Sequence, residues 1–394
     1  MVTIEHLIKW RRDLHQHPEL SFEEFKTTKY IINQLKELPG VRLQQGKELL
    51  GIETGVLAVV GDGSTPIVGL RADIDALPVK EQTGEPFQSC HEGIMHACGH
   101  DGHTAMLLGA VHYLSHLYQR GKLKGTVKCL FQPAEEAEDI NGKTGAQYVL
   151  DSGALSDVES IIALHLDPEL SLGNAKLKPG IVMANVDTFT LNIFGSGGHG
   201  AYPEQTIDPI WLTSMILPYF YSVTSRKVAA DEPAVLSICQ IIGGASTNVI
   251  PEKVTIKGTI RSYSDTAREK LVAECKRGLK LIKELGGTFT FHLHQGEPAL
   301  VNNQEITKLL ENILYQKGVS IHQQTFGMGG EDFSHITRII PGAMIFLGAK
   351  DELRHTSLHQ PTFSFNESVL EHGMEILVEG ALAMIKRRRD HNGS

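Results

Sequence analysis

Short apolar runs that end in charged or polar side chains most constrain the fold of this chain. The runs lie at 54–61, 66–73, 125–133 and 160–167, and segments with helical spacing, such as 104–118, alternate with them. This order predicts an α/β fold with a mostly parallel central sheet that helices cover on both faces. In such sheets, sites form just beyond the carboxyl ends of the strands. The stretches "RADID", "QPAEE" and "LHLD" all occupy that position.

Two helices are expected near the amino terminus, at 3–17 and 22–37. The second has a conventional start signal, because Ser21 can serve as the N-cap and Glu24, three residues on, completes a capping box. The sequence therefore predicts that these two side chains serve the helix itself.

The pattern changes after about residue 183. The order is a strand, a helix, two strands, a helix and a strand, at 186–195, 206–225, 234–242, 253–261, 265–285 and 288–294. This β-α-β-β-α-β order predicts a two-layer α+β unit of the ferredoxin-like kind. We therefore expect residues 184–292 to form an inserted domain, and residues 1–183 and 293–394 to form the larger α/β domain.

Composition excludes several functional classes. With 41% hydrophobic and 21% charged residues the chain is typical of globular proteins, and its net charge of −9 argues against a nucleic-acid partner. The sequence has no apolar stretch of 18 residues, so no membrane span is expected, and its first residues lack the features of a secretory signal. Five cysteines, an odd number, do not suggest a disulfide framework and favour the reducing cytoplasm.

The stretch "MHACGHDGHT" at 95–104 concentrates possible metal ligands. Cysteine thiolate and histidine imidazole are the usual ligands of transition metals. Cys98 and His100 lie two residues apart in a glycine-containing loop before a helix, which can aim both donors at one point. The alternative is an ordinary helix start with Asp101 as its cap and incidental histidines such as His96 and His103. Four donors within 98–103 favour a metal site.

Two adjacent glutamates, Glu135 and Glu136, follow the run at 125–133. Paired glutamates usually lie in solvated loops, but a divalent cation beside them would let one carboxylate bind the metal while its neighbour acts as a base. His165 ends the run at 160–167, and His359 precedes a proline turn. A lone histidine at a strand end is unremarkable, but the accumulation of such strand ends favours His165 as a further ligand, whereas His359 has no such support from its local sequence.

These segments together resemble the M20 family of metal-dependent amidohydrolases and peptidases, and most closely its branch of aminoacylases, hippurate hydrolases and indole-acetyl-amino-acid hydrolases. The resemblance covers nearly the whole chain and rests on motifs in a fixed order: "RRDLHQHPELSFEE", "GLRADIDALP", "MHACGHDGHTAMLLGA", "FQPAEE", "GSGGHGAYPE", "NVIP", "GTIRS", "GGEDFS" and "LHQPTFSFNE". It implies a catalytic, metal-binding α/β domain interrupted by a smaller satellite domain that often serves dimerisation. A homodimer or higher homo-oligomer is therefore expected.

The resemblance also implies roles for single residues. Two divalent metal ions per subunit, of zinc, manganese, cobalt or nickel, are expected on Cys98, His100, Glu136, His165 and His359. The general base is expected to be Glu135. In a two-metal site a bridging water is the nucleophile, and a neighbouring carboxylate can take its proton and pass it to the leaving amine. Cys98 is the expected bridge, because a thiolate can bridge two metals and an imidazole normally cannot.

Five further residues receive less direct roles. "DID" at 73–75 stands where other family members carry HxD, so Asp73 and Asp75 are expected to orient ligands without binding metal; a strand-end salt bridge with Arg71 is the alternative for them. In the inserted domain, the resemblance implies that His199 reaches the active site and polarises the scissile carbonyl, either within its own subunit or from a partner subunit. Asn248 and Arg261 would bind the carbonyl or carboxylate of the substrate. Ordinary turn or surface roles are the alternatives for these three.

The sequence thus predicts a dinuclear-metal amidohydrolase that cleaves N-acyl-L-amino acids. A dipeptidase, carboxypeptidase or aminopeptidase of the same family remains open, because a short peptide differs from such a substrate mainly at its acyl end. Two other classes are a metal-stabilised binding protein without catalysis and a hydrolase that uses Cys98 as its nucleophile. The expected partner is a small N-acyl amino acid or short peptide, with neither nucleic acid nor membrane.

Overall fold

The computed structural model describes residues 2–352, 354 and 356–392. The chain divides into two compact units. Unit 1 contains residues 1–180, 301–326 and 332–394, and unit 2 contains residues 181–300 and 327–331. Each unit has its own hydrophobic core.

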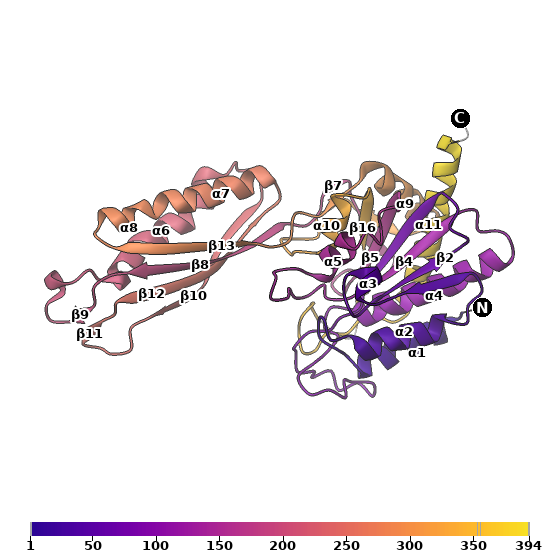
Figure 1. Ribbon diagram of the computed structural model, residues 1–394, viewed down its shortest axis with the longest axis horizontal. Helices are drawn as coiled ribbons and strands as arrows, with labels where there is room; N and C mark the ends of the chain where they lie inside the picture. Colours follow the sequence, from indigo (N-terminus) through magenta and orange to yellow (C-terminus); the bar gives the residue numbers. More distant parts are fainter. Residues whose placement is uncertain (1, 353, 355, 393–394) are drawn as a thin grey trace. The chain divides into compact units, whose positions relative to one another are not determined.

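Unit 1 is built on an eight-stranded sheet with the order β1-β2-β4-β3-β5-β16-β6-β15. Strands β2, β4, β5 and β16 of this sheet are labelled in Figure 1. The strands are β1 Val41–Gln44, β2 Val56–Val60, β3 Ile67–Asp73, β4 Thr126–Gln132, β5 Ser160–Asp167, β6 Asn174–Lys176, β15 Ser320–His322 and β16 Gly342–Gly348. The central strands β4, β3, β5 and β16 are parallel, whereas β1, β2 and β6 pair antiparallel with their neighbours β2, β4 and β16. The predicted α/β class with a mostly parallel central sheet is confirmed.

Two long helices pack against this sheet and against each other. They are α4, His100–Gln119, and α11, Val369–Asn392, and both contact β3 and β5. The other helices of unit 1 are α1 Ile4–Gln16, α2 Phe25–Leu35, α3 Lys47–Leu50, α5 Gly145–Asp151, α9 Gln304–Gln316 and α10 Phe333–Thr337. Helix α1 lies along α4, as Figure 1 shows. The buried side chains between sheet and helices are almost all aliphatic or aromatic, so burial of apolar surface stabilises this unit.

The predicted start of the second helix is wrong. Helix α2 begins at Phe25 rather than at 22, its N-cap is Glu24, and no side chain makes a capping hydrogen bond. Phe22 has a left-handed backbone with φ of 69°, which interrupts any helix at that residue. The side chains of Ser21 and Glu24 instead bond to residues far along the chain.

Unit 2 has a four-stranded antiparallel sheet with the order β10-β12-β8-β13. Its strands are β8 Asn185–Phe194, β10 Ala234–Gly243, β12 Lys253–Ser262 and β13 Thr288–Gln295, and its helices are α6 Pro209–Lys227, α7 Asp265–Gly278 and α8 Lys280–Glu284. The helices cover one face of the sheet (Figure 1). The expected order of strands and helices is present, but the helix expected at 265–285 divides into α7 and α8.

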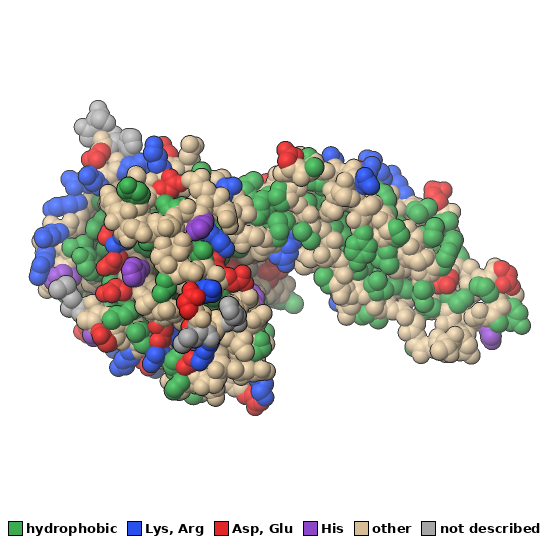
Figure 2. All heavy atoms as spheres, turned by 180° about the vertical axis from the view of Figure 1, so that it is seen from behind, with side chains coloured by type: hydrophobic (Ala, Val, Ile, Leu, Met, Phe, Trp, Pro, Cys, Tyr) green, Lys and Arg blue, Asp and Glu red, His purple; other side chains and the backbone are tan. Residues whose placement is uncertain are grey.

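Short elements complete the chain. Strands β9, Gly198–His199, and β11, Val249–Ile250, pair with each other in unit 2. The remaining elements are β7 Gly180–Ile181, β14 Val301–Asn302 and the short 3-10 helix η1 Pro203–Gln205. Figure 2 shows hydrophobic side chains gathered on the exposed surface of unit 2. Among the described residues, no helix has the length and apolar character that crossing a membrane requires.

Candidate metal centre

The carboxyl ends of the parallel strands in unit 1 bring the predicted site residues to one edge of the sheet. Asp73, the last residue of β3, pairs in register with Gln132, the last residue of β4. The chain leaves β4 at that point and reaches Glu135 and Glu136 three and four residues later. His165 lies near the end of the neighbouring strand β5. The sheet therefore positions residues that are far apart in sequence.

The donor atoms of the six predicted metal-ligand and base residues come together. Three groups form in which the donor atoms all lie within 4.8 Å of one another: Cys98 with His100 and His165, Cys98 with Glu136 and His359, and His100 with Glu135 and Glu136. Cys98 Sγ lies 3.5 Å from His165 Nε2 and 3.3 Å from His359 Nε2. His359 Nε2 lies 3.4 Å from Glu136 Oε1. Cys98, His100 and Glu136 each belong to two of these groups, so the groups overlap in one cluster.

Two imidazoles are held with one nitrogen directed to this cluster. His100 donates from Nδ1 to the Asp75 carbonyl oxygen at 3.0 Å, and the same nitrogen lies 3.2 Å from an Asp75 carboxylate oxygen. His165 donates from Nδ1 to the Leu166 carbonyl oxygen at 2.8 Å. In neutral imidazoles, this arrangement leaves the lone pair on Nε2, the geometry found in metal-binding histidines.

The electrostatics of the cluster favour a cation. Burial disfavours the imidazolium of His100, but the surrounding carboxylates, Asp73 foremost, outweigh burial and raise its pKa to about 10. Burial and the nearby carboxylates of Glu136 and Glu135 hold the pKa of the Cys98 thiol well above its ordinary value. A divalent ion would satisfy both groups, since it displaces the protons and offsets the carboxylate charge.

Unpartnered buried atoms provide an independent test of this fit. His100 Nε2 and Glu136 Oε1 are both buried, and neither makes a hydrogen bond to another described residue, although Glu136 Oε1 lies 3.4 Å from His359 Nε2. Such atoms are costly unless an ion, a water or another group satisfies them. Both belong to the groups of possible ligands above. The donor set of thiolate, imidazole and carboxylate suits zinc and other borderline transition metals.

Two residues at the cluster have a strained backbone. Ala134, directly before the two glutamates, has φ of 52°, and His359 has φ of 64°. Residues other than glycine rarely adopt this left-handed conformation, which costs roughly 1–2 kcal/mol each. Hydrogen bonds hold both residues, since His359 N donates to the Ala97 carbonyl oxygen at 2.8 Å and Ala134 N donates to Glu24 at 2.7 Å.

A buried network of charged groups lies behind the cluster. Arg71 donates to Asp73 at 2.7 Å and to Asp332 at 2.8 Å, and all three side chains are at most 1% exposed. Asp73 also bonds to His103 Nδ1 at 2.6 Å, and His103 Nε2 accepts from Leu166 N. Both nitrogens of His103 are therefore occupied, which argues against a role as ligand. Asp73 makes the salt bridge that was the alternative interpretation, whereas Asp75 contacts His100 directly.

The three predicted substrate residues lie in unit 2, and the structure does not bring all of them together. His199 pairs with Val249 across the β9–β11 ladder, and Gly200 N donates to the Asn248 carbonyl oxygen, so His199 and Asn248 are close neighbours. Arg261 lies near the other end of β12 and donates to the Met328 carbonyl oxygen. The strand rise of about 3.4 Å per residue places Lys253, at the start of β12, roughly 27 Å from Arg261.

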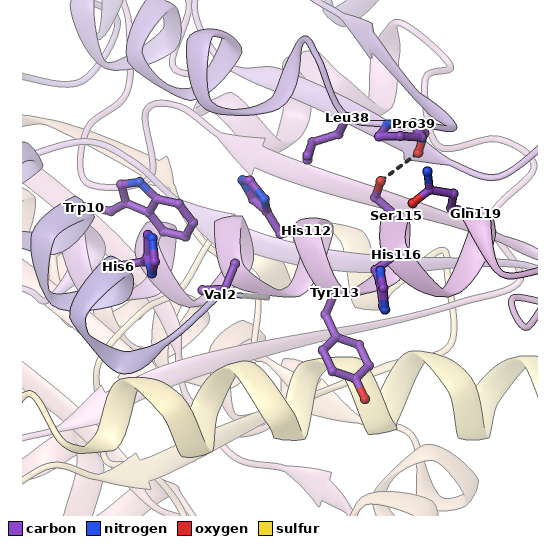
Figure 3. A pocket seen from close by; sticks show the side chains of 10 residues that line it. All are labelled: Val2, His6, Trp10, Leu38, Pro39, His112, Tyr113, Ser115, His116 and Gln119. Carbon is purple, nitrogen blue, oxygen red and sulfur yellow. Dashed lines mark hydrogen bonds between the residues drawn. The ribbon is translucent and has the colours of Figure 1, made fainter.

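Further histidines line a groove of about 300 Å³ between α1, α4 and the segment at Leu38 and Pro39. Figure 3 shows His6, His112 and His116 there, with the Trp10 ring beside His112. The rings of Trp10 and His112 stack with their centroids 5.1 Å apart. Across the described ranges, none of the groups of three possible metal ligands includes a residue of this groove. The histidine count alone would not have separated this groove from the Cys98 cluster.

Sequence reasoning left several residues without a role or misassigned them. Asp332 accepts from Arg71, from Gln132 at 2.9 and 2.8 Å and from the backbone of Ala146, and it is fully buried. Asp101, considered as a helix cap, bonds instead to Arg11 and His15 at 2.8 Å. His15 is accordingly part of a buried ionic network on the first helix. The glycine-rich stretch around Asp332 was the only signal for its position.

Comparisons with known proteins point to one family. A model of the peptidase family M20/M25/M40 matches residues 69–383. The chain is 37% identical over 391 residues to an N-acetyl-L-cysteine deacetylase of Bacillus subtilis, covering 98% of this chain and 89% of the relative. It is 34% identical to thermostable carboxypeptidase 1 of Saccharolobus solfataricus, covering 93% and 92%.

A solved structure gives the same result for the fold. The crystal structure of a Bacillus subtilis protein described as a dinuclear metal binding peptidase from the M20 family superposes with a TM-score of 0.83 and 33% identity. The similarity covers 97% of this chain and 98% of the other. The family match over most of the length and these full-length similarities establish that this chain is an enzyme of the M20 family of metal-dependent amidohydrolases and peptidases.

Proposed function

We propose that this enzyme hydrolyses the amide bond of N-acyl-L-amino acids with two divalent metal ions. The observation that carries the proposal is the overlap of three groups of possible ligands, which share Cys98, His100 and Glu136 and lie beside Glu135. The relatives are consistent with this chemistry, because one of them is named a deacetylase of an N-acetyl amino acid. The metals would be held by Cys98, His100, Glu136, His165 and His359, with Cys98 shared between them.

When bound, the metal ions would supply Lewis acidity and lower the pKa of a water molecule to near neutrality. The chain's own residues supply the rest of the mechanism. Glu135, half-buried beside the cluster, takes the proton of the attacking water and then donates it to the leaving amine. Asp75 fixes the orientation of His100 through Nδ1, and Leu166 fixes that of His165. The buried Arg71–Asp73–His103 network stabilises the strand ends from which these residues project.

The positions of the expected substrate-binding residues in unit 2 suggest that two subunits contribute to each active site. Arg261 is separated from the His199–Asn248 pair by most of the length of β12, so one small substrate cannot contact both ends of a single unit 2. We assign Arg261 to bind the substrate carboxylate, and His199 of the partner subunit, with Asn248 of the partner subunit, to polarise the scissile carbonyl.

The surface of unit 2 supports such a second copy. Strand β10 lies at the edge of the sheet, where Ile241 and Ile242 are about half exposed. Ile210, Trp211 and Met215 of α6 are exposed to a similar degree. An edge strand with apolar neighbours is a typical pairing surface. We propose a homodimer through β10 and α6.

A metallopeptidase of the same family is the second candidate, because the 34% identical relative is named a carboxypeptidase. A nucleophilic Cys98 is less consistent with the structure. Its thiol is surrounded by carboxylates that raise its pKa, whereas catalytic cysteines lie beside cationic groups that lower it. Because Cys98 must remain reduced to bind metal, the proposal places the enzyme in a reducing compartment such as the cytoplasm.

A substrate panel tests the proposal. Enzyme of assayed metal content is given acetyl-, benzoyl- and aminoacyl-amino acids side by side, with and without a chelator. We expect turnover of the acetyl or benzoyl substrates and its loss with the chelator. Fast cleavage of dipeptides without any action on N-acyl amino acids would favour the peptidase. Activity that survives complete removal of metal would contradict both.

A mixing experiment tests the shared site. Glu135→Gln and His199→Ala subunits, each inactive alone, are exchanged and assayed. If His199 acts across the dimer, mixed dimers contain one complete site and recover part of the activity. No recovery after verified exchange would place His199 and Glu135 of the same subunit in one site.

A further inference from the structure

The turn that presents Glu135 and Glu136 is held by a short segment from the start of the chain, Ser21–Glu24. Glu24 is fully buried, and one of its carboxylate oxygens accepts from Ala134 N at 2.7 Å. Its other oxygen accepts from the Thr54 hydroxyl at 2.8 Å. None of the roles assigned above uses this buried carboxyl.

The contact with Ala134 falls where the turn is strained. Ala134 has the left-handed φ of 52°, which its side chain disfavours, and the next two residues are Glu135 and Glu136. A rotation at Ala134 would swing both carboxylates, because they are attached directly after it. A strained conformation persists only where its surroundings hold it in place. The hydrogen bond from Ala134 N to Glu24 is such a restraint.

Two further contacts hold the same turn. The Ala134 carbonyl oxygen accepts from Gly145 N at 2.8 Å. A Cβ at Gly145 would lie 1.7 Å from the Pro133 carbonyl oxygen, so the close approach of these two backbones requires glycine. Glu136 N donates at 2.9 Å to Asp75, whose same carboxylate oxygen accepts from the Ser21 hydroxyl at 2.7 Å.

Ser21 and Glu24 therefore reach the turn at two points, one on each side of Glu135. Their own segment is fixed beside the site, because Leu20 pairs with Ala76 and Ala76 N donates to the Glu19 carbonyl oxygen at 2.8 Å. Between them, Phe22 has its own left-handed φ of 69°. The pattern that resembles a capping box is thus a two-point clamp on the proposed base and ligand.

We propose that Glu24 is a positioning residue, whose carboxylate oxygen holds Ala134 in its left-handed conformation and thereby sets the orientation of Glu135 and Glu136. The inference rests on the proposed function of those two glutamates. It requires an acceptor atom at the right reach, and it does not require the negative charge of Glu24. Glutamine has the same reach and one acceptor oxygen, whereas aspartate has the charge but is shorter by one methylene.

The experiment compares Glu24→Gln with Glu24→Asp. Metal affinity is measured by titration with Zn²⁺ and Mn²⁺, and kcat and KM are measured at saturating metal. We expect Glu24→Asp to lose about 10- to 100-fold in metal affinity or kcat, the usual scale for residues that orient metal ligands, with KM little changed. Glu24→Gln should remain within a few-fold of the wild type.

Glu19 offers a matched control. Its carboxylate accepts from Thr27 N at 2.8 Å and from the Thr27 hydroxyl at 3.0 Å, the same combination of backbone and threonine donors that Glu24 has. Glu19→Asp should lower the melting temperature without changing metal affinity or kcat. An equal catalytic effect of the two aspartate variants, or a Glu24→Gln variant as impaired as Glu24→Asp, would overturn the proposal.

The experiment separates an error in the proposed function from an error in the proposed role of Glu24. If the wild type binds neither metal and hydrolyses no amide, the proposed function is wrong. A crystal structure of Glu24→Asp then still tests the clamp through the backbone at Ala134. We expect φ at Ala134 to leave the left-handed region. An unchanged φ would overturn the positioning role.

Discussion

Strands β3, β4, β5 and β16 of unit 1 are buried at every residue, whereas β8 and β12 of unit 2 alternate between buried and more exposed positions. The sheet of unit 2 can direct polar side chains such as Thr188 and Lys257 to water on its open face. The sheet of unit 1 has no such face at its centre. Ionisable groups at its carboxyl edge must therefore find partners inside the protein or bind a cation.

The difference between the two sheets explains where a catalytic site can form. At the edge of the buried sheet, His100, Asp73 and Asp75 are all at most 1% exposed, and their charges act on one another with little screening. In unit 2, polar groups on the open face are solvated and their interactions are weak. Substitutions at the first sheet should thus have large effects on metal binding, activity and stability, and equivalent substitutions at the second should not.

The largest effect is expected at Glu135. Glu135→Gln removes the proposed base and keeps the size of the side chain, so kcat should fall by on the order of 10²–10⁴ with metal retained. Glu136→Gln should lose metal as well, because Glu136 is a proposed ligand. Glu138→Gln, on the exposed continuation of the same loop, is the control and should change neither quantity. Equal metal contents in the first two variants would contradict the assigned division of roles.

The next effect concerns the buried charges behind the cluster. Arg71→Met removes the guanidinium that Asp73 and Asp332 share, and the loss of one partner from a buried ion pair costs about 3–5 kcal/mol. Chemical denaturation of metal-free protein measures the loss in the free energy of unfolding. Lys80→Met is the control, because its pair with Glu92 is exposed on both sides, and it should cost less than about 1 kcal/mol. Similar costs for the two variants would mean that buried and solvated ion pairs contribute equally to the stability of this protein.

A smaller effect, dependent on pH, is expected at Glu24. Burial and the nearby carboxylate of Asp75 raise the pKa of Glu24 from 4.5 to about 8. Between these two values the folded protein holds a proton that the unfolded chain has lost, so wild-type stability falls as pH rises through this window. The contribution is at most about 1.4 kcal/mol per pH unit.

Glu24→Gln removes this titration. The difference in unfolding free energy between Glu24→Gln and the wild type, measured from pH 5 to pH 8 on metal-free protein, should therefore increase with pH in favour of the variant. A constant difference across that range would mean that Glu24 ionises in the folded state as it does in the unfolded chain.

Sequence patterns were sufficient for the parts of the structure that depend on local periodicity. The apolar runs predicted strands β3, β4 and β5, and their carboxyl ends placed Glu136 and His165 at one edge, whereas Cys98 was expected there from its own motif and from the family resemblance. This succeeds because a parallel sheet brings its strand ends to one edge whatever the length of the connections. The family resemblance added His359, which no local pattern would have selected.

Local sequence patterns failed to predict the hydrogen-bond partners of polar side chains that can bond either within their own segment or to residues far along the chain. Ser21 and Glu24 have the spacing of a capping box, and only the fold reveals that they bond to Asp75 and Ala134 instead. The Arg71–Asp332 pair joins residues 261 positions apart, so no window of sequence contains both. In both cases, polar groups near the site serve its geometry in place of local secondary structure.

The smallest effect is expected on the open face of unit 2. Asn192 donates to the Thr290 hydroxyl at 3.1 Å and accepts from the Thr255 hydroxyl at 2.9 Å, across three strands of the sheet. Because water can replace both bonds when the side chain is removed, Asn192→Ala should cost no more than about 1 kcal/mol and leave metal content and kcat unchanged. Denaturation and metal assays of the variant measure these quantities. A loss comparable to that of Arg71→Met would mean that this face is covered in the assembled enzyme, and the contrast between the two sheets would then hold only for the isolated chain.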